Sequence, residues 1–276
     1  MTGCLISAER KGSMTNIREI DAYLNSRAPE ELAAAILEFR QDGRAGVRKL
    51  LDKHERRLQA FRKELERLDG MMVYERKYTE FELIAGIDEA GRGPLAGPVV
   101  AAAVVLPKDR PILYVNDSKQ LSEKKREELF PVIMTEAVAV GVGMAGPELI
   151  DEINILQATY EAMRHAVADL IRPNGSAVVP DLLLNDAVRI PGLPMRQVPI
   201  IKGDAKSCSI AAASIIAKVT RDRIMREYDS IYPEYGFAKH KGYGSKEHIE
   251  ALRTYGPCPI HRRSFIGGIL GEESSI

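Results

Sequence analysis

The chain has 276 residues, enough for one catalytic domain and a smaller additional domain. Its 45% hydrophobic and 28% charged residues are ordinary for a soluble globular protein, and no apolar run approaches the roughly 20 residues that span a bilayer. The net charge is zero, so composition gives no support to nucleic-acid binding, although residues 202–263 hold twelve Lys and Arg against seven Asp and Glu. Three scattered cysteines and the lack of an export signal lead us to expect a cytoplasmic protein without a disulfide framework.

The N-terminal quarter of the chain reads as helical. Residues 1–13 show no periodicity and are expected to be disordered, and Met14 is an alternative start. Apolar residues then recur at helical spacing, and breaks at Ala28-Pro29 and Asp42-Gly43 divide the stretch into about three helices. We therefore expect a small α-helical domain over residues 14–75 with a basic middle. It either touches a nucleic-acid backbone or packs as an appendage, and we slightly favour the appendage.

Residues 76–270 are expected to form an α/β catalytic domain that includes the C-terminal helices. Ser122 is a candidate cap for one helix, and two longer helices are predicted over 148–171 and from Ser207 to about Tyr228. Short apolar runs predict strands over 81–87, 99–106, 137–144, 181–184 and 198–201. The first three strands are expected to be antiparallel, and the fourth, which follows a long helix, is expected to run parallel to the first. The sequence thus predicts a mixed sheet flanked by helices.

The segment Gly86-Ile87-Asp88-Glu89-Ala90-Gly91-Arg92-Gly93-Pro94 carries the most chemical information. Two adjacent carboxylates at a strand end repel each other unless a cation lies between them, and such hard oxygen ligands suit Mg²⁺ or Mn²⁺. The glycines that follow allow a backbone N–H to approach another molecule closely. A surface hairpin with two solvated acids is the alternative that this segment leaves open by itself.

Two further acids stand at comparable positions. Asp186 ends the fourth predicted strand and Asp204 precedes the helix that begins near Ser207. Side chains at the carboxyl ends of strands converge where α/β sheets bind ligands, and neighbouring strands are about 4.8 Å apart. Together with Asp88 and Glu89, these acids match a site for two divalent ions about 4 Å apart. Taken singly, Asp186 and Asp204 are each better explained as turn-forming aspartates, a common use of that residue.

From Leu83 to Phe265 the chain resembles the bacterial ribonuclease HII family. Besides the segment just quoted, the resemblance rests on four motifs in order: Asp117-Ser118-Lys119, Ile210 to Asp222, His240-Lys241-Gly242-Tyr243-Gly244-Ser245-Lys246-Glu247-His248, and His261-Arg262-Arg263-Ser264-Phe265. It implies a ribonuclease-H-like fold with two divalent metals, Mg²⁺ or Mn²⁺. It also implies an endonuclease that hydrolyses the RNA strand of RNA–DNA hybrids and incises duplex DNA 5′ of single embedded ribonucleotides, as in ribonucleotide excision repair.

The resemblance also assigns residues. The family's four metal-binding acids match Asp88, Glu89, Asp186 and Asp204, which are therefore the expected catalytic and metal-ligating residues. Its Gly-Arg-Gly element matches Gly91, Arg92 and Gly93, and its ribonucleotide-sensing tyrosine matches Tyr243. Contact with the 2′-OH is what distinguishes RNA from DNA. Candidates for phosphate contacts are Ser118, Lys119, Lys218, Arg262 and Arg263. We expect a monomer that binds hybrid and ribonucleotide-containing duplexes, with no membrane association.

Several points depart from the family pattern or leave alternatives open. Asn185 stands where members usually have an apolar residue, and Ala187 where many have glycine. Asp222 competes with Asp204 as the fourth acid, but Lys218 one turn earlier suggests an ion pair on the helix surface. The nearest alternative function is a ribonuclease HIII, in which the loop typically reads Gly-Thr-Gly, so Arg92 argues against it. A catalytically silent duplex-binding protein is the second alternative.

Overall fold

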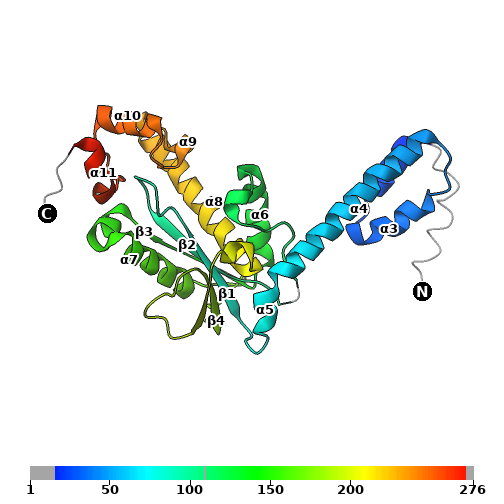
Figure 1. Cartoon of the computed structure of the whole chain (residues 1–276), viewed down its shortest axis with the longest axis horizontal. Coiled ribbons are helices and arrows are strands. Elements are labelled where there is room, and N and C mark those ends of the chain that lie inside the picture. Colours follow the sequence, from blue (N-terminus) through cyan, green and yellow to red (C-terminus); the bar gives the residue numbers. More distant parts are fainter. Residues whose placement is uncertain (1–15, 109, 272–276) are drawn as a thin grey trace. The chain divides into compact units, whose positions relative to one another are not determined.

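The computed structural model describes residues 16–108 and 110–271 and divides into two compact units, Met1–Arg67 and Leu68–Ile276 (Figure 1). The expectation of disorder in residues 1–13 falls outside the described residues. The boundary between the units lies inside helix α4 (Ala45–Met71), and the domain limits drawn at residue 75 stay a prediction. Within the described residues, no helix is both long and apolar enough to cross a membrane.

The first unit is helical, as expected. Helices α2 (Ile17–Asn25) and α3 (Pro29–Glu38) are followed by the first part of α4. Asn16 caps α2 by accepting a hydrogen bond from the N–H of Arg18 at 3.0 Å. A small core holds these helices together, and its fully buried members are Ile20, Leu24, Leu32 and Val47.

The second unit contains a five-stranded mixed sheet, which confirms the predicted fold class. The strands are β1 (Ile84–Ala90), β2 (Val99–Val105), β3 (Ala139–Ala145), β4 (Leu182–Asp186) and β5 (Arg196–Ile200). Their order is β3-β2-β1-β4-β5. Strand β2 is antiparallel to both β1 and β3, whereas β4 is parallel to both β1 and β5.

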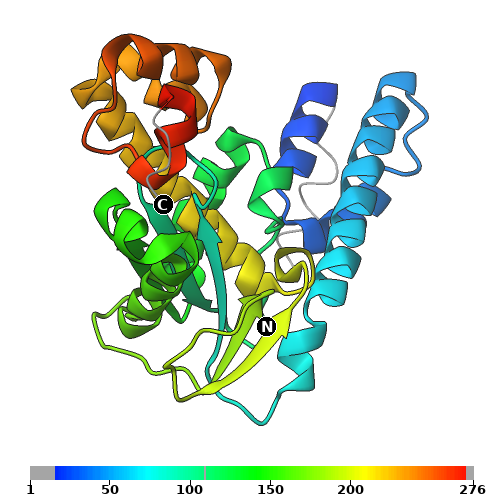
Figure 2. The ribbon, with the colours of Figure 1, turned by 60° about the vertical axis from the view of Figure 1, so that its left-hand side comes forward.

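Helices cover both faces of this sheet (Figure 2). Helix α7 (Pro147–Ala168) packs on one face, and α6 (Glu123–Glu136) and α8 (Cys208–Ile231) pack on the other. As predicted, Ser122 caps α6, with its side chain accepting from the N–H of Lys125 at 3.2 Å. The remaining helices of the described part are α5 (Val73–Lys77), α9 (Phe237–His240), α10 (Lys246–Tyr255) and α11 (Arg263–Leu270).

Helix α8 lies unusually close to the first strand. A Cβ placed on Gly86 would lie only 2.1 Å from the carbonyl carbon of Ser209, so only glycine fits in β1 at this point. The first turns of α8 are fully buried and built from small residues, among them Ala211, Ala212 and Ala213. This close packing brings the segment that precedes α8 to the same edge of the sheet as the carboxyl end of β1.

Strand β1 begins and ends three residues later than the sequence suggested. We expected it to end at Ile87, but it continues to Ala90 because its antiparallel partner β2 pairs with every residue up to that point. The parallel partner β4 pairs with β1 only as far as Ile87 and Asn185. Asp88 and Glu89 therefore lie in the last part of the strand, hydrogen-bonded on one side and open on the other.

Candidate active site

Three carboxylates come to one edge of the sheet. In the parallel pair of β1 and β4, Ile87 lies opposite Asn185, so the next residues, Asp88 and Asp186, follow side by side. Because side chains alternate along a strand, Asp88 lies on the same face as Gly86, which is the face that α8 covers. Asp204 belongs to the short 3₁₀ turn Gly203–Ala205, just before α8. The edge thus combines residues from two strands and one turn.

Hydrogen bonds fix the turn that carries Asp204. The Oδ1 atom of Asp186 accepts the N–H of Gly203 at 2.7 Å. Ser207 caps α8 by accepting from the N–H of Ile210 at 3.2 Å, and its hydroxyl donates to Oε1 of the buried Glu75 at 2.6 Å. Asp186 is therefore tied directly to the residue before Asp204, and the two carboxylates are neighbours although 17 positions separate Asp186 from Gly203.

The electrostatics of these acids are those of crowded carboxylates. Burial raises the pKa of Asp88 well above its ordinary value, and the charges of Glu89, Asp186 and Asp204 raise it further. Burial raises the pKa of Glu89 even though Arg92 opposes the shift. Burial, followed by the charges of Asp117 and Asp186, raises the pKa of Asp204. The four predicted acids therefore interact with one another, at a cost that a bound cation would remove.

The donor set fits a hard divalent cation. Among residues 16–108 and 110–271, no three His, Cys, Asp or Glu side chains are already arranged as a metal site. Asp88 is only 6% exposed, and its Oδ1 atom accepts just the N–H of the next residue at 2.8 Å. Buried carboxylate oxygens close to other carboxylates, with few hydrogen-bond donors, are the chemistry that Mg²⁺ and Mn²⁺ require. The residues present therefore fit the predicted ions.

Two buried arginines shape the glycine-rich loop after β1. Arg262 donates to the carbonyl oxygens of Gly91 at 2.6 Å, Arg92 at 2.8 Å, and Gly97. Arg221 donates to the carbonyl oxygens of three more residues, Ala96, Pro98 and Lys241, at 2.9 to 3.0 Å. Gly91 has φ +94°, and a Cβ there would lie 2.0 Å from Nε of Arg221. The two guanidinium groups thus hold the backbone of the glycine-rich loop, which includes the predicted Gly-Arg-Gly element.

This arrangement revises the role expected for Arg262. Its side chain is completely buried, and its Nε, Nη1 and Nη2 atoms all donate to backbone carbonyls, so none faces a phosphate. Burial lowers the pKa of Arg262 to about 9 and that of Arg221 to about 10. Sequence reasoning did not single out Arg221, although it lies in one of the quoted motifs. The signal available in the sequence was that this basic residue follows the alanine-rich, buried segment of α8 by four positions.

Tyr243 lies beside the glycine-rich loop. A Cβ on Gly93 would lie 3.9 Å from Cε1 of the Tyr243 ring, and 48% of the tyrosine is exposed. The two segments are joined by the backbone bond from Leu95 N–H to the carbonyl oxygen of Gly242, at 2.8 Å. The structure therefore brings the predicted Gly-Arg-Gly element and Tyr243 together, with about half of the tyrosine open to solvent.

The other phosphate candidates differ in accessibility. Lys119 and Arg263 are exposed, whereas Ser118 is buried and its N–H donates to Oγ of Ser214 at 3.2 Å. Although burial opposes it, the charges of Asp88, Asp117 and Asp204 raise the pKa of Lys119. Among the candidates for phosphate contacts, Lys119 is thus the residue whose charge interacts directly with the carboxylates of the acidic cluster.

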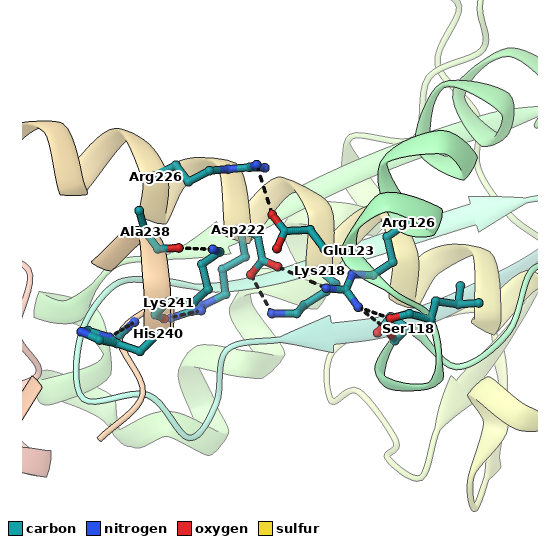
Figure 3. A network of polar contacts seen from close by, with 12 residues as sticks. Ser118, Glu123, Arg126, Lys218, Asp222, Arg226, Ala238, His240 and Lys241 are labelled. Atoms are coloured by element: carbon teal, nitrogen blue, oxygen red, sulfur yellow. Dashed lines mark hydrogen bonds and ion pairs between the residues drawn. The ribbon is translucent and has the colours of Figure 1, made fainter. Parts of the chain in front are cut away.

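Lys218 is engaged in the ion pair suggested by its spacing (Figure 3). Its Nζ atom lies 2.6 Å from Oδ1 of Asp222, whose Oδ2 atom is 3.8 Å from Nη2 of Arg126. Arg126 in turn donates to the carbonyl oxygen of Ser118 at 2.8 Å. Asp222 is buried and not on the surface as expected, yet two cations already neutralise it. This favours Asp204 as the fourth acid of the cluster.

Comparisons with known proteins show to which family this chain belongs. The model of the family described as ribonuclease HII matches residues 85–267, and that of the ribonuclease HII N-terminal domain matches residues 16–79. The chain belongs to the ribonuclease HII family. It is 62% identical over 225 residues to the ribonuclease HII of Lachnoclostridium phytofermentans, covering 82% of this chain and 86% of that protein. It is 52% identical over 257 residues to that of Clostridioides difficile, covering 92% and 98%.

A solved structure agrees with this assignment. The ribonuclease H2 of Pyrococcus horikoshii OT3 superposes with a TM-score of 0.56 and 30% identity, covering 69% of this chain and 98% of that chain. As a ribonuclease HII family member, the chain is a nuclease with ribonuclease H activity on RNA–DNA hybrids. The resemblance stated from the motifs is thereby confirmed, and so is the ribonuclease-H-like fold.

Proposed function

We propose that this chain incises duplex DNA on the 5′ side of single embedded ribonucleotides, as well as hydrolysing the RNA strand of hybrids. The products are 3′-hydroxyl and 5′-phosphate ends. The observation that carries the proposal is the electrostatic coupling of Asp88 with Glu89, Asp186 and Asp204, next to a loop in which several backbone carbonyls accept hydrogen bonds from the buried Arg221 and Arg262.

Asp88, Glu89, Asp186 and Asp204 are the residues that would hold two divalent cations, Mg²⁺ or Mn²⁺. When bound, these ions supply a lowered pKa for the attacking water and charge stabilisation for the leaving 3′-oxygen. The protein supplies no nucleophile of its own. Its carboxylates repel one another, so the site favours cations and disfavours anionic groups.

We assign recognition of the ribose to the glycine-rich loop after β1 and to Tyr243. Arg262 holds the carbonyls of Gly91 and Arg92 on one side of the loop, which leaves the other side of the Gly91 to Gly93 backbone to face the substrate. A backbone this close to a nucleotide can hydrogen-bond a 2′-OH, which both donates and accepts. The Tyr243 ring, about half exposed next to Gly93, stacks on the neighbouring sugar and excludes a poorly fitting strand.

Basic residues around this edge position the backbone. Lys119 is exposed and interacts with the acidic cluster, so it is suited to a phosphate next to the cleaved bond. Arg92 is partly exposed and lies 3.4 Å from Oε1 of Glu89, which places a guanidinium between the loop and the cluster. Phosphate contacts of this kind orient a duplex without reading its sequence.

The test compares two substrates. A duplex with one ribonucleotide and a long RNA–DNA hybrid are incubated with the protein plus Mg²⁺, Mn²⁺ or a chelator. We expect metal-dependent incision of both, mapped to the 5′ side of the single ribonucleotide. Cleavage of the hybrid alone would support the ribonuclease HIII alternative and overturn the proposal. Replacing Tyr243 with Ala should lower incision of the first substrate more than cleavage of the second.

A further inference from the structure

Three histidines near Tyr243 form a connected set of rings in the second unit. The rings of His240 and His248 are stacked, with centroids 4.5 Å apart and planes 12° apart. The Nε2 atom of His248 lies 3.0 Å from Nε2 of His261, and both side chains are buried. The rings of Phe237 and Tyr235 pack against these imidazoles from the 3₁₀ turn Pro233–Tyr235 and helix α9. The His248 and His261 rings are therefore shielded from water, whereas His240 is partly exposed.

The partners of each ring decide where its proton sits. Nδ1 of His248 faces the carbonyl oxygen of Tyr243 at 2.9 Å, and a carbonyl only accepts, so Nδ1 carries the proton. Nδ1 of His261 accepts the N–H of Cys258 at 3.0 Å, so this atom is unprotonated and Nε2 carries the proton. The contact between the two Nε2 atoms then has one donor, on His261, and one acceptor, on His248.

His240 completes the pattern in the same way. Its Nε2 atom faces the carbonyl oxygen of Tyr235 at 2.8 Å and donates, whereas its Nδ1 atom accepts the N–H of Gly242 at 3.2 Å. All three imidazoles are thus neutral, and each uses one nitrogen as donor and the other as acceptor. Adding a proton to His248 or His261 would place two N–H groups against each other or against the N–H of Cys258.

The same set connects the two halves of the proposed ribose site. The backbone of His261 pairs with Ala96 in an isolated antiparallel bridge, and the N–H of Gly97 donates to the carbonyl of Ile260 at 2.8 Å. A continuous path of contacts therefore runs from the glycine-rich loop through the His261 and His248 rings to the carbonyl of Tyr243. The tyrosine side chain itself remains half exposed.

We propose that His248 and His261 are positioning residues for the ribonucleotide reaction. Through one chain of hydrogen bonds between neutral imidazoles, they set the Tyr243 ring against the Gly91–Gly93 loop. The inference rests on the proposed function, in which Tyr243 contacts the ribose. Neither histidine touches the substrate, because both are buried behind the tyrosine backbone.

The first test reads the protons directly. In protein labelled with ¹⁵N-histidine, two-bond ¹⁵N–¹H spectra at pH 7.5 distinguish the two neutral tautomers and the imidazolium form. We expect Nδ1–H for His248 and Nε2–H for His240 and His261. An imidazolium, or Nε2–H on His248, contradicts the proposed chain whether or not any variant folds.

The second test uses matched substitutions at His248. His248→Asn places an amide nitrogen near the position of Nδ1 and keeps a donor for the Tyr243 carbonyl, whereas His248→Leu fills similar space without one. For the duplex with one ribonucleotide, we expect His248→Leu to lower kcat/KM by about tenfold or more, and His248→Asn to recover most of that loss. His165→Leu, the same substitution at an exposed histidine, is the control and should leave incision unchanged.

A double-mutant cycle with Tyr243→Ala separates positioning from stability. If His248 acts through Tyr243, adding His248→Leu to Tyr243→Ala causes little further loss. Losses that multiply, or a folded His248→Leu variant that incises as well as the wild type, overturn the positioning role alone. A wild-type protein that cleaves hybrids but does not incise at a ribonucleotide overturns the proposed function instead. Thermal unfolding of every variant confirms that a folded protein is being assayed.

Discussion

Two nitrogen atoms of the Arg262 guanidinium, Nε and Nη2, donate to the single carbonyl oxygen of Gly97, at 2.9 and 2.8 Å. The same side chain also reaches the carbonyls at the start of the loop, so one planar group holds both ends of the segment from Gly91 to Gly97. Only a rigid fork with several donors can do this. The shape of the proposed ribose site therefore depends on a residue that does not touch the substrate.

Arg262→Lys should destabilise the protein by about 2 kcal/mol, because one ammonium group cannot reach all of these carbonyls and buried acceptors are left unpaired. It should also raise KM for the duplex with one ribonucleotide. Urea unfolding and steady-state kinetics measure the two effects. Arg253→Lys, an exposed site in α10, is the control, with an expected change in stability below about 0.5 kcal/mol. Equal stabilities of the two variants would contradict the role of Arg262.

Asp88→Asn should raise stability in the presence of a chelator while abolishing turnover. The folded-state pKa of Asp88 lies well above the ordinary value of an aspartate, so the stability linked to its protonated form is lost as the pH rises through the folded-state pKa. At neutral pH the charged side chain is therefore unfavourable, and removing its charge should raise the free energy of unfolding. Turnover should fall by about a thousandfold or more. A variant less stable than the wild type in chelator would contradict this account.

Asp204→Asn and Asp222→Asn should separate the two candidates for the fourth acid. Asp222 is neutralised by Lys218 and Arg126, so its replacement leaves cations unpaired and should cost about 2 kcal/mol. The increase in Tm on adding Mg²⁺ should survive in Asp222→Asn and shrink in Asp204→Asn. Differential scanning calorimetry with and without Mg²⁺ makes the comparison. The reverse pattern would assign the metal to Asp222.

Acid should weaken the fold through His261. Burial and the neighbouring His248 lower its pKa to about 4, from an ordinary histidine value of about 6.5. For a group with a depressed folded-state pKa, the stabilisation is present above about pH 6.5 and is lost as the pH falls toward about 4. After solvent screening this amounts to about 2 kcal/mol. The free energy of unfolding, measured from pH 7.5 to 4, should fall more steeply in the wild type than in His261→Leu; parallel curves would refute the assignment.

Much of the fold follows from local patterns in the sequence. The alternating and continuous apolar runs predict all five strands, and Ser122 is recognisable as a helix cap because its oxygen precedes a charged first turn. The end of β1 is not predictable in this way. Asp88 and Glu89 are polar, and only the antiparallel partner β2 keeps them in the sheet. Pairing between strands, and not residue type, decides that boundary.

The candidate site likewise has a part that the sequence predicts and a part that it does not. Asp88 is conspicuous because a carboxylate ends an apolar strand, and the register of β1 with β4 then brings Asp186 next to it. The environment of Arg262 is not visible in the sequence, since its partners lie 165 or more positions away. A basic motif predicts phosphate contacts equally well, and only burial distinguishes the two roles. The contact between His248 and His261 is likewise tertiary, because it depends on how α10 and the following loop return to the glycine-rich loop.

Anomalous X-ray diffraction from crystals soaked in Mn²⁺ tests the central claim most directly, because it locates the cations without relying on activity. Our account predicts anomalous peaks within coordination distance of Asp88, Asp186 and Asp204, with Glu89 joining them. Peaks bound only elsewhere, or no peak at the carboxyl ends of β1 and β4 at saturating Mn²⁺, would contradict it.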